Sequence, residues 1–223
     1  MEYCKINTLF KRDGRNVIIP DEFTEDVFEV LENCLWECTE KIDGTNMRVE
    51  LTKDDWGWTM VFGGRTDKAN IPGQLLERMH SIFDGVNWDY IFPDVTPGTA
   101  ITVYGEGYGR KIQGCGSRYI PDNVDFILFD VRIGGMWLKR DACKDIAMKI
   151  GVNIVPLMGF MTIPEAIDMV RTGFSSTIAD DSTLPAEGLV LKAPCGMLDR
   201  QGRRIITKIK TKDFRDLERK SKI

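Results

Sequence analysis

Apolar and polar residues alternate with a period of two along much of the chain, and this pattern is typical of half-buried strands. Stretches with this pattern are 36–41, 46–52, 58–64, 99–107, 125–133, 153–160, 187–194 and 204–211. Residues 9–20 form a further strand pair, with Asp13-Gly14 at the turn. Most of these stretches follow one another at hairpin distance, which predicts antiparallel pairing.

Other segments carry apolar residues at helical spacing. The predicted helices are 21–35, 73–83, 141–151 and 163–173. The first would place Phe23, Val27, Leu31 and Leu35 on one face. Because the helices are interspersed irregularly among the strands, the pattern favours an α+β fold with mainly antiparallel sheets over a doubly wound parallel sheet.

Composition narrows the class of protein. With 223 residues, of which 43% are hydrophobic and 29% charged, the chain has the size of one large domain or two small ones. It contains no apolar run of the ~18 residues that a membrane helix needs, and no apolar signal core near its start. Six scattered cysteines predict reduced thiols and a cytoplasmic protein. One histidine, His80, argues against a two-histidine metal motif or a histidine-centred triad.

Charge is distributed unevenly along the chain. The net charge is -4, but residues 203–223 carry +6, so the remainder carries -10. A basic segment on an acidic body favours contact with a polyanion. We therefore expect this C-terminal tail to touch nucleic-acid phosphates, although a solvated terminal helix of mixed charge would give the same composition.

The segment from Glu40 to Asn46, EKIDGTN, combines groups that suit covalent chemistry. Lys41 becomes a nucleophile when nearby positive charge or burial lowers its pKa. Gly44 permits a close approach of backbone to a ligand, and the oxygens of Asp43 and Asn46 suit a hydrated cation. A surface turn is the plainer interpretation of these residues taken alone.

Together with five later segments, EKIDGTN resembles the ordered motifs of the covalent nucleotidyltransferases, the superfamily of ATP-dependent DNA ligases, RNA ligases and capping enzymes. The later segments are Gly64-Arg65-Thr66, Tyr104–Gly107, Phe126–Val131, Glu187–Lys192 and Lys208-Ile209-Lys210. All six follow the family order. The resemblance implies one adenylyltransferase domain over residues 1–223, with the basic tail at about 203–223 and no oligonucleotide-binding domain.

The resemblance also implies roles for individual residues. Lys41 would attack the α-phosphorus of ATP and hold AMP. Glu187, with Asp43 through water, would hold Mg²⁺ or Mn²⁺. Lys208 and Lys210, which alternate on one strand face, would neutralise the α-phosphate. The implied nucleotide-binding residues are Glu40, Ile42, Asn46, Arg65, Glu106 for the ribose, Phe129 for the adenine, Glu187, Lys208 and Lys210. Arg48 would pair with an acid on a neighbouring strand, and Lys192 would support the segment after Glu187.

Asn46 separates branches of the superfamily. The chain resembles RNA ligases of the bacteriophage and archaeal types here, because these carry asparagine at this position. DNA ligases and capping enzymes usually have arginine there. We therefore expect an ATP-dependent RNA ligase acting in RNA repair, of bacteriophage type, that joins 5′-phosphate and 3′-hydroxyl ends in the cytoplasm. The alternatives are a DNA ligase that seals nicks, a non-catalytic nucleic-acid-binding relative and, last, a capping guanylyltransferase. The expected partners are nucleic-acid ends, and RNA is favoured over DNA. We expect no membrane partner.

Overall fold

Two separate hydrophobic cores organise the chain. The computed structural model describes residues 1–220. Unit 1 contains Met1–Cys4 and Asp43–Val155, and unit 2 contains Lys5–Ile42 and the described residues from Pro156 onward. No helix among the described residues is long and apolar enough to cross a membrane.

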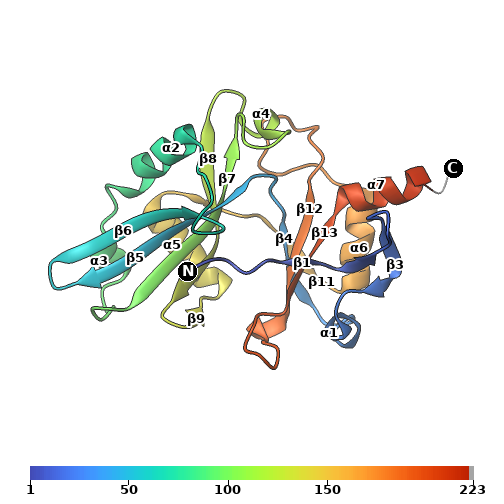
Figure 1. The fold of residues 1–223 in the computed structure, drawn as a ribbon, viewed down its shortest axis with the longest axis horizontal. Coiled ribbons are helices and arrows are strands. Elements are labelled where there is room, and N and C mark those ends of the chain that lie inside the picture. The colour runs from blue at the N-terminus through green and yellow to red at the C-terminus, as the bar shows by residue number, and fades with distance from the viewer. Residues whose placement is uncertain (221–223) are drawn as a thin grey trace. The chain divides into compact units, whose positions relative to one another are not determined.

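Unit 1 is built on one sheet of order β10-β8-β7-β5-β6, with β9 paired to β8 (Figure 1). Its strands are β5 (Thr45–Asp54), β6 (Gly57–Gly64), β7 (Ala100–Gly109), β8 (Val124–Ile133), β9 (Met136–Trp137) and β10 (Asn153–Ile154). Its helices are α2 (Gly73–Phe83), α3 (Trp88–Ile91), α4 (Gly116–Tyr119) and α5 (Arg140–Ile150). The core holds alternate residues of β5, such as Met47, Val49 and Leu51, together with Phe83 and Phe126.

Unit 2 contains a five-stranded sheet of order β1-β13-β12-β4-β11 and the separate β2–β3 hairpin (Figure 1). Its strands are β1 (Asn7–Thr8), β2 (Phe10–Arg12), β3 (Ile18–Phe23), β4 (Trp36–Glu40), β11 (Leu157–Met161), β12 (Gly188–Lys192) and β13 (Ile206–Lys210). Its helices are α1 (Asp26–Val30), α6 (Ile163–Thr172), a 3₁₀ turn, η1 (Pro194–Gly196), and α7 (Thr211–Lys220). Trp36, Cys38 and Leu189 lie in its core.

The predicted α+β class with mainly antiparallel sheets is confirmed. The two exceptions among the described strand pairs are the two-residue parallel pairings of β1 with β13 and of β10 with β8. Local signals account for several boundaries. Thr162 and Glu165 form a capping box at the start of α6, and Gly151 ends α5 with φ of 86°. At the predicted 13–14 turn, the Asp13 carboxylate accepts from the backbone N–H groups of Arg15 and Val17.

The predicted helix over 21–35 is wrong in extent, because helix covers only Asp26–Val30. Phe23 instead pairs with Phe10 in the β2–β3 hairpin, and Leu35 is 58% exposed. The Trp36 indole donates to the Leu31 carbonyl at 2.9 Å, which satisfies a backbone group where the helix has ended.

The predicted strand over 153–160 is also wrong as a single element. It divides into β10, which joins the sheet of unit 1, and β11, which joins the sheet of unit 2. Pro156 lies between them and has no backbone N–H to donate, so a continuous ladder cannot pass through it.

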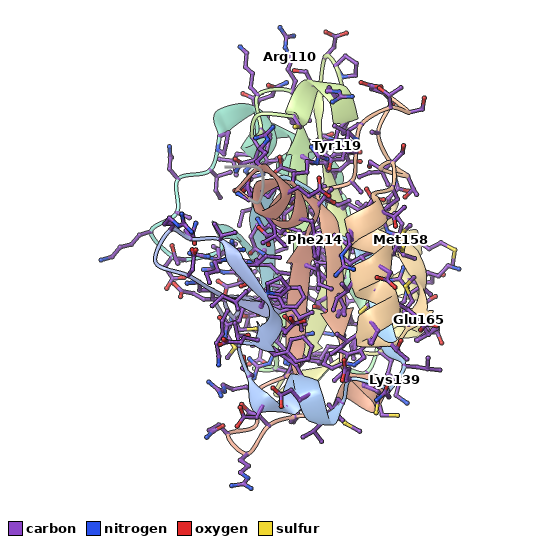
Figure 2. The ribbon with its side chains drawn as sticks, turned by 90° about the vertical axis from the view of Figure 1, so that its right-hand side faces the viewer. Arg110, Tyr119, Lys139, Met158, Glu165 and Phe214 are labelled. Atoms are coloured by element: carbon purple, nitrogen blue, oxygen red, sulfur yellow. The ribbon has the colours of Figure 1, made fainter. Side chains whose placement is uncertain are left out.

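The described part of the basic tail after β13 forms a helix with one buried side, α7. Phe214, labelled in Figure 2, is a residue of this helix. It is 4% exposed, and its ring packs edge-on against Phe10 with centroids 6.2 Å apart. Asp213 accepts a hydrogen bond of 2.8 Å from Arg12. The segment is therefore part of unit 2, and its exposed side alone is available for other contacts. Residues 221–223 of the tail lie outside the described residues.

Candidate active site

Three charged side chains meet where β4, β12 and β13 of unit 2 lie side by side. The Lys41 ammonium lies 2.5 Å from Oε2 of Glu187, and the Lys210 ammonium lies 2.7 Å from Oε1 of the same carboxylate. Their side chains are 20%, 16% and 22% exposed, in the order Lys41, Glu187, Lys210. One carboxylate thus orients two ammonium groups in a partly desolvated site, where charge-assisted hydrogen bonds are strong.

Strand register brings these residues together. Gly188 of β12 lies opposite Lys210 of β13, and the Lys41 backbone N–H donates to the Gly188 carbonyl at 2.9 Å. Gly188 has φ of 147°, and a side-chain carbon there would lie 2.9 Å from the Lys210 Cα. A residue other than glycine would therefore force β12 and β13 apart beside the lysine–carboxylate cluster.

Lys208 adds a third cation on the same face of β13. Burial, together with the neighbouring charges of Lys210 and Lys41, lowers the pKa of Lys208 to about 8. Three lysines beside one carboxylate leave net positive charge, so the cluster is suited to an anion such as a phosphate. On the outer part of β12, Lys192 lies 3.9 Å from Glu37 of β4.

The carboxylate of Glu40, directly before Lys41, is fully engaged within unit 2. Glu40 is 1% exposed and accepts hydrogen bonds from the Ser176 hydroxyl at 2.5 Å and from the Thr177 N–H and hydroxyl at 2.9 and 2.6 Å. Ile42, on the other side of Lys41, is also buried, and its carbonyl accepts from the lysine at 3.4 Å. Sequence reasoning missed Ser176 and Thr177, because a hydroxyl-rich loop carries no sign of a partner 136 residues away.

In unit 1, Asn46 of β5 lies opposite Glu106 of β7. Gly44 makes this close pairing possible, since a side-chain carbon at Gly44 would lie 2.7 Å from Cγ of Glu106. Gln113 donates to the Gly44 carbonyl at 3.2 Å, and the Asp43 N–H donates to the Tyr119 hydroxyl at 3.3 Å. The turn that leads from Lys41 into β5 is thus held tightly against β7.

Asn46 keeps one buried polar atom open. Among the described residues its Oδ1 is buried without a hydrogen-bond partner. Because such an atom costs stability unless a donor reaches it, it marks a position where a ligand could donate a hydrogen bond.

The buried Arg48 holds the turn that carries Arg65. Its guanidinium donates to the Gly64 carbonyl and pairs with Asp67, on either side of Arg65, and it lies 3.3 Å from Glu50. Arg65 itself is exposed. The acids that pair with Arg48 come from its own strand and from the turn after β6.

Phe129 occupies a β-bulge between β7 and β8. The register runs from Tyr104 opposite Asp130 to Gly105 opposite Leu128, so Phe129 is the extra residue, and bulges redirect side chains. Phe129 is half-buried, with the Tyr3 ring edge-on at 5.0 Å, and the Tyr3 hydroxyl donates to Asp130 at 2.6 Å. Tyr3 had no signal in the sequence pattern.

The expected site residues therefore divide between the units. Unit 2 brings together Lys41, Glu187, Lys208 and Lys210, and also carries Glu40 and Ile42; unit 1 carries Asp43, Asn46, Arg65, Glu106 and Phe129. Within the described residues, no three histidine, cysteine, aspartate or glutamate side chains gather as a metal site.

The family model described as RNA ligase matches residues 35–210, from β4 to the last residue of β13. The chain belongs to the RNA ligase family. No curated protein matches it.

Solved structures share the fold of this RNA ligase family member. The structure of Naegleria gruberi RNA ligase with PPi has a TM-score of 0.64 and 18% identity, over 99% of this chain and 58% of that one. A lysine-to-alanine variant of that enzyme with ATP and Mn gives a TM-score of 0.62 and 17% identity, over 87% and 54%. A lysine-to-methionine variant with AMP and Mn gives 0.60 and 18%, over 95% and 58%. The present chain thus spans between half and three fifths of these proteins.

Proposed function

We propose that this chain is an ATP-dependent RNA ligase that joins 5′-phosphate and 3′-hydroxyl ends through a covalent lysyl-AMP and an adenylated 5′ end. The observation that carries the proposal is the Glu187 carboxylate held between Lys41 and Lys210, with Lys208 beside them. Membership of the RNA ligase family and the ATP- and AMP-bound structures of similar fold support it.

In the first step, the Lys41 nitrogen forms a bond to the α-phosphorus of ATP, and the bond from that phosphorus to the bridging oxygen breaks. The Lys41 ammonium first gives one proton to solvent to become the neutral amine that attacks; pyrophosphate leaves with the electron pair, and the nitrogen then gives up a second proton and keeps one in the phosphoramidate. Glu187, 2.5 Å from the lysine, orients the nitrogen, while Lys208 and Lys210 stabilise charge on the phosphate oxygens. In the second step an oxygen of the RNA 5′-phosphate bonds to the AMP phosphorus, the bond from that phosphorus to the Lys41 nitrogen breaks, and the lysine takes up a proton. In the third step the 3′-hydroxyl loses its proton and bonds to the 5′-phosphorus, and AMP leaves.

A divalent cation fits the residues present. Mg²⁺ takes oxygen ligands and keeps several waters, so one or two carboxylates with substrate phosphates are sufficient to bind it. In the proposal Glu187 would hold Mg²⁺ or Mn²⁺, with Asp43 acting through water. The ion would offset phosphate charge. Glu187, a carboxylate that is 16% exposed between two lysines, offers the oxygens that such an ion shares with substrate phosphates.

The remaining expected residues would bind the nucleoside. We assign Glu106 to the ribose hydroxyls, Phe129 to the adenine face and Arg65 to the ribose or a phosphate. Asn46 supports the assignment through its open buried oxygen. The Glu40 carboxylate already accepts hydrogen bonds from Ser176 and Thr177. In our proposal Glu40 and Ile42 therefore lie beside the adenine and help to shape its site, and the Glu40 carboxylate does not hydrogen-bond to the base.

Our proposal also covers the domain organisation, the cellular role and the location of the protein. We assign residues 1–223 to one adenylyltransferase domain whose basic segment at about 203–223 contacts RNA, without an oligonucleotide-binding domain in this span. We also propose a role in RNA repair and a bacteriophage-type enzyme, on the resemblance at Asn46, and a cytoplasmic location, on the scattered cysteines.

The test is intact-mass spectrometry after incubation with ATP and Mg²⁺ and then with pyrophosphate. We expect an AMP-sized mass increase that pyrophosphate reverses. Lys41→Met should lack it, whereas Lys11→Met, an exposed lysine on β2 paired with Glu22, should form it normally. No adduct in the unaltered protein, or an adduct that persists in Lys41→Met, would refute the lysyl-AMP proposal.

Sealing assays then separate the substrates. We expect 5′-phosphorylated RNA ends to be joined faster than an all-DNA nick of the same sequence. Preference for the DNA nick would make the chain a DNA ligase, and an adduct with GTP in place of ATP would make it a guanylyltransferase.

A further inference from the structure

Unit 2 contains an open groove beside its lysine–carboxylate cluster. It lies between the C-terminal end of α6, the loop residues after it, and the first two turns of α7, and its volume is about 490 Å³. That volume is in the range of small-ligand sites and would accommodate a nucleotide. All of its lining residues belong to unit 2.

The groove presents cations together with hydroxyl groups. Arg171 from α6 and Arg215 from α7 line it, as do Thr172, Ser175 and Thr183. Guanidinium groups bind phosphate oxygens through paired N–H donors, and hydroxyls add single donors. This combination is typical of a phosphate-binding surface rather than an apolar docking site.

One arginine is held in place within the groove. The Arg171 guanidinium lies over the Phe214 ring at 5.5 Å from its centroid, and Phe214 is anchored by its own burial. Arg171 also lies 3.4 Å from the exposed Asp168, one turn earlier on α6. Stacking fixes the plane of the guanidinium, so less side-chain entropy is lost when it binds an anion.

Charges of both signs line the groove. Glu218, one turn after Arg215 on α7, is the acidic residue among the lining residues. It would weaken the binding of any anion there. Removing the Glu218 charge should therefore strengthen anion binding, whereas removing an arginine charge should weaken it.

Thr211 is the groove residue that lies next to the lysine cluster along the chain. Thr211 lines the groove, directly follows Lys210, and donates from its backbone N–H to the Glu187 carbonyl at 2.9 Å. Its hydroxyl donates to the Ala186 carbonyl at 2.9 Å. Beyond it, Lys212, Arg215 and Arg219 are exposed and recur at helical spacing on one side of α7.

We propose that this groove binds the phosphodiester backbone of the RNA strand whose end reacts at the Lys41 centre, with Arg171 and Arg215 contacting phosphates. This inference rests on the proposed RNA ligase function and adds to it a second substrate-binding region, outside the residues that bind ATP. It explains why a basic helix follows directly after Lys210.

The experiment measures the binding of a short 5′-phosphorylated, fluorescein-labelled RNA to the full chain by anisotropy over a range of salt concentrations. Arg171→Gln/Arg215→Gln should weaken binding at low salt by at least about tenfold. It should also flatten the slope of log K against log salt by about 1.4, the loss of two single-strand phosphate contacts. Glu218→Gln should strengthen binding. The matched control is Arg15→Gln, which removes a 79%-exposed arginine outside the groove.

Self-adenylation by ATP, followed by intact mass, separates this proposal from the proposed function. All four proteins should form the adduct at similar rates and unfold at similar temperatures. The groove proposal would be overturned if the double variant and Glu218→Gln both bound RNA as the Arg15→Gln control does. That result would leave the ligase proposal standing. Loss of adenylation in the folded double variant would also overturn it, because the groove would then act on ATP. Absence of the adduct in the unaltered protein would instead refute the ligase function itself.

Discussion

Lys208 shows how the candidate site lowers the stability of the fold that carries it. Burial and the charges of Lys210 and Lys41 lower its pKa from the ordinary 10.5 to about 8. Between these two pH values the unfolded chain binds a proton that the folded protein lacks, so stability rises with pH. Below about pH 8 the full cost of this half-buried charge is present.

Lys208→Met should therefore stabilise the protein at pH 7, by at most roughly 3 kcal/mol, since each pKa unit corresponds to about 1.4 kcal/mol. Its stability should also rise less steeply than that of the unaltered protein between about pH 8 and 10.5. Urea unfolding at several pH values measures both effects. Lys212→Met, which removes an exposed lysine of α7, is the control; an equal response from both variants would contradict the assignment of the penalty to Lys208.

The cysteines give a second prediction at this scale. Burial raises the pKa of the Cys38 thiol to about 12, and Cys143 is also buried, whereas Cys4, Cys115 and Cys195 are exposed. Since the thiolate is the reactive form, iodoacetamide should modify the three exposed cysteines first and leave Cys38 and Cys143 intact until the protein unfolds. Peptide mass spectrometry at increasing urea concentration reads out the order. Early labelling of Cys38 in native protein would show that β4 is not packed as described.

At the scale of elements, Gly44 couples the turn after Lys41 to strand β7. A methyl group at Gly44 would meet the Gly107 carbonyl and lie 2.7 Å from Cγ of Glu106. Gly44→Ala should therefore push β5 and β7 apart, destabilise the protein by roughly 1 to 3 kcal/mol, and slow self-adenylation by about 100-fold as Glu106 shifts.

Thermal unfolding and the rate of AMP-adduct formation test this together. Gly14→Ala is the matched control, because a side-chain carbon at Gly14 meets nothing within 4 Å. We expect Gly14→Ala to keep both stability and rate. If Gly44→Ala adenylates as fast as Gly14→Ala, then the approach of β7 to the turn is not needed for the reaction.

At the scale of the whole molecule, period-two alternation was sufficient to find most strands, because each strand has one face in a core. The same reasoning failed where a long-range pairing or a proline decides the outcome. Phe23 joined a hairpin rather than a helix, and the 153–160 segment divided at Pro156 between two sheets. Local periodicity contains no information about either event.

The candidate site divides in a similar way. The order of the family motifs predicted which charged residues belong to the candidate site, among them Lys41, Glu187 and Lys210. The register of β4, β12 and β13 accounts for the contact of these three in unit 2. The partners that support them were not visible in the sequence. Ser176 and Thr177 reach Glu40 from 136 and 137 residues away. Such contacts follow from tertiary packing alone.

Truncation after Lys212 tests how α7 is integrated into the molecule. The basic composition alone suggests a removable tail, but truncation would delete Asp213 and Phe214, each 4% exposed. It would leave Arg12 without its partner at 2.8 Å and open the core around Phe10. Loss of a buried phenylalanine typically costs about 3 to 5 kcal/mol, so the truncated protein should unfold at a distinctly lower temperature.

The contrasting variant is full-length Lys212→Gln/Arg219→Gln, which removes exposed charges and keeps the buried side of α7. It should unfold at the same temperature as the unaltered protein and lose only salt-sensitive RNA affinity. Equal melting temperatures for the truncated and full-length proteins would show that α7 does not stabilise unit 2. If the truncated protein melts at the expected lower temperature, its reduced RNA binding would reflect partial loss of the fold as well as loss of charge. Point substitutions on the exposed face of α7 are therefore needed to measure the contribution of charge.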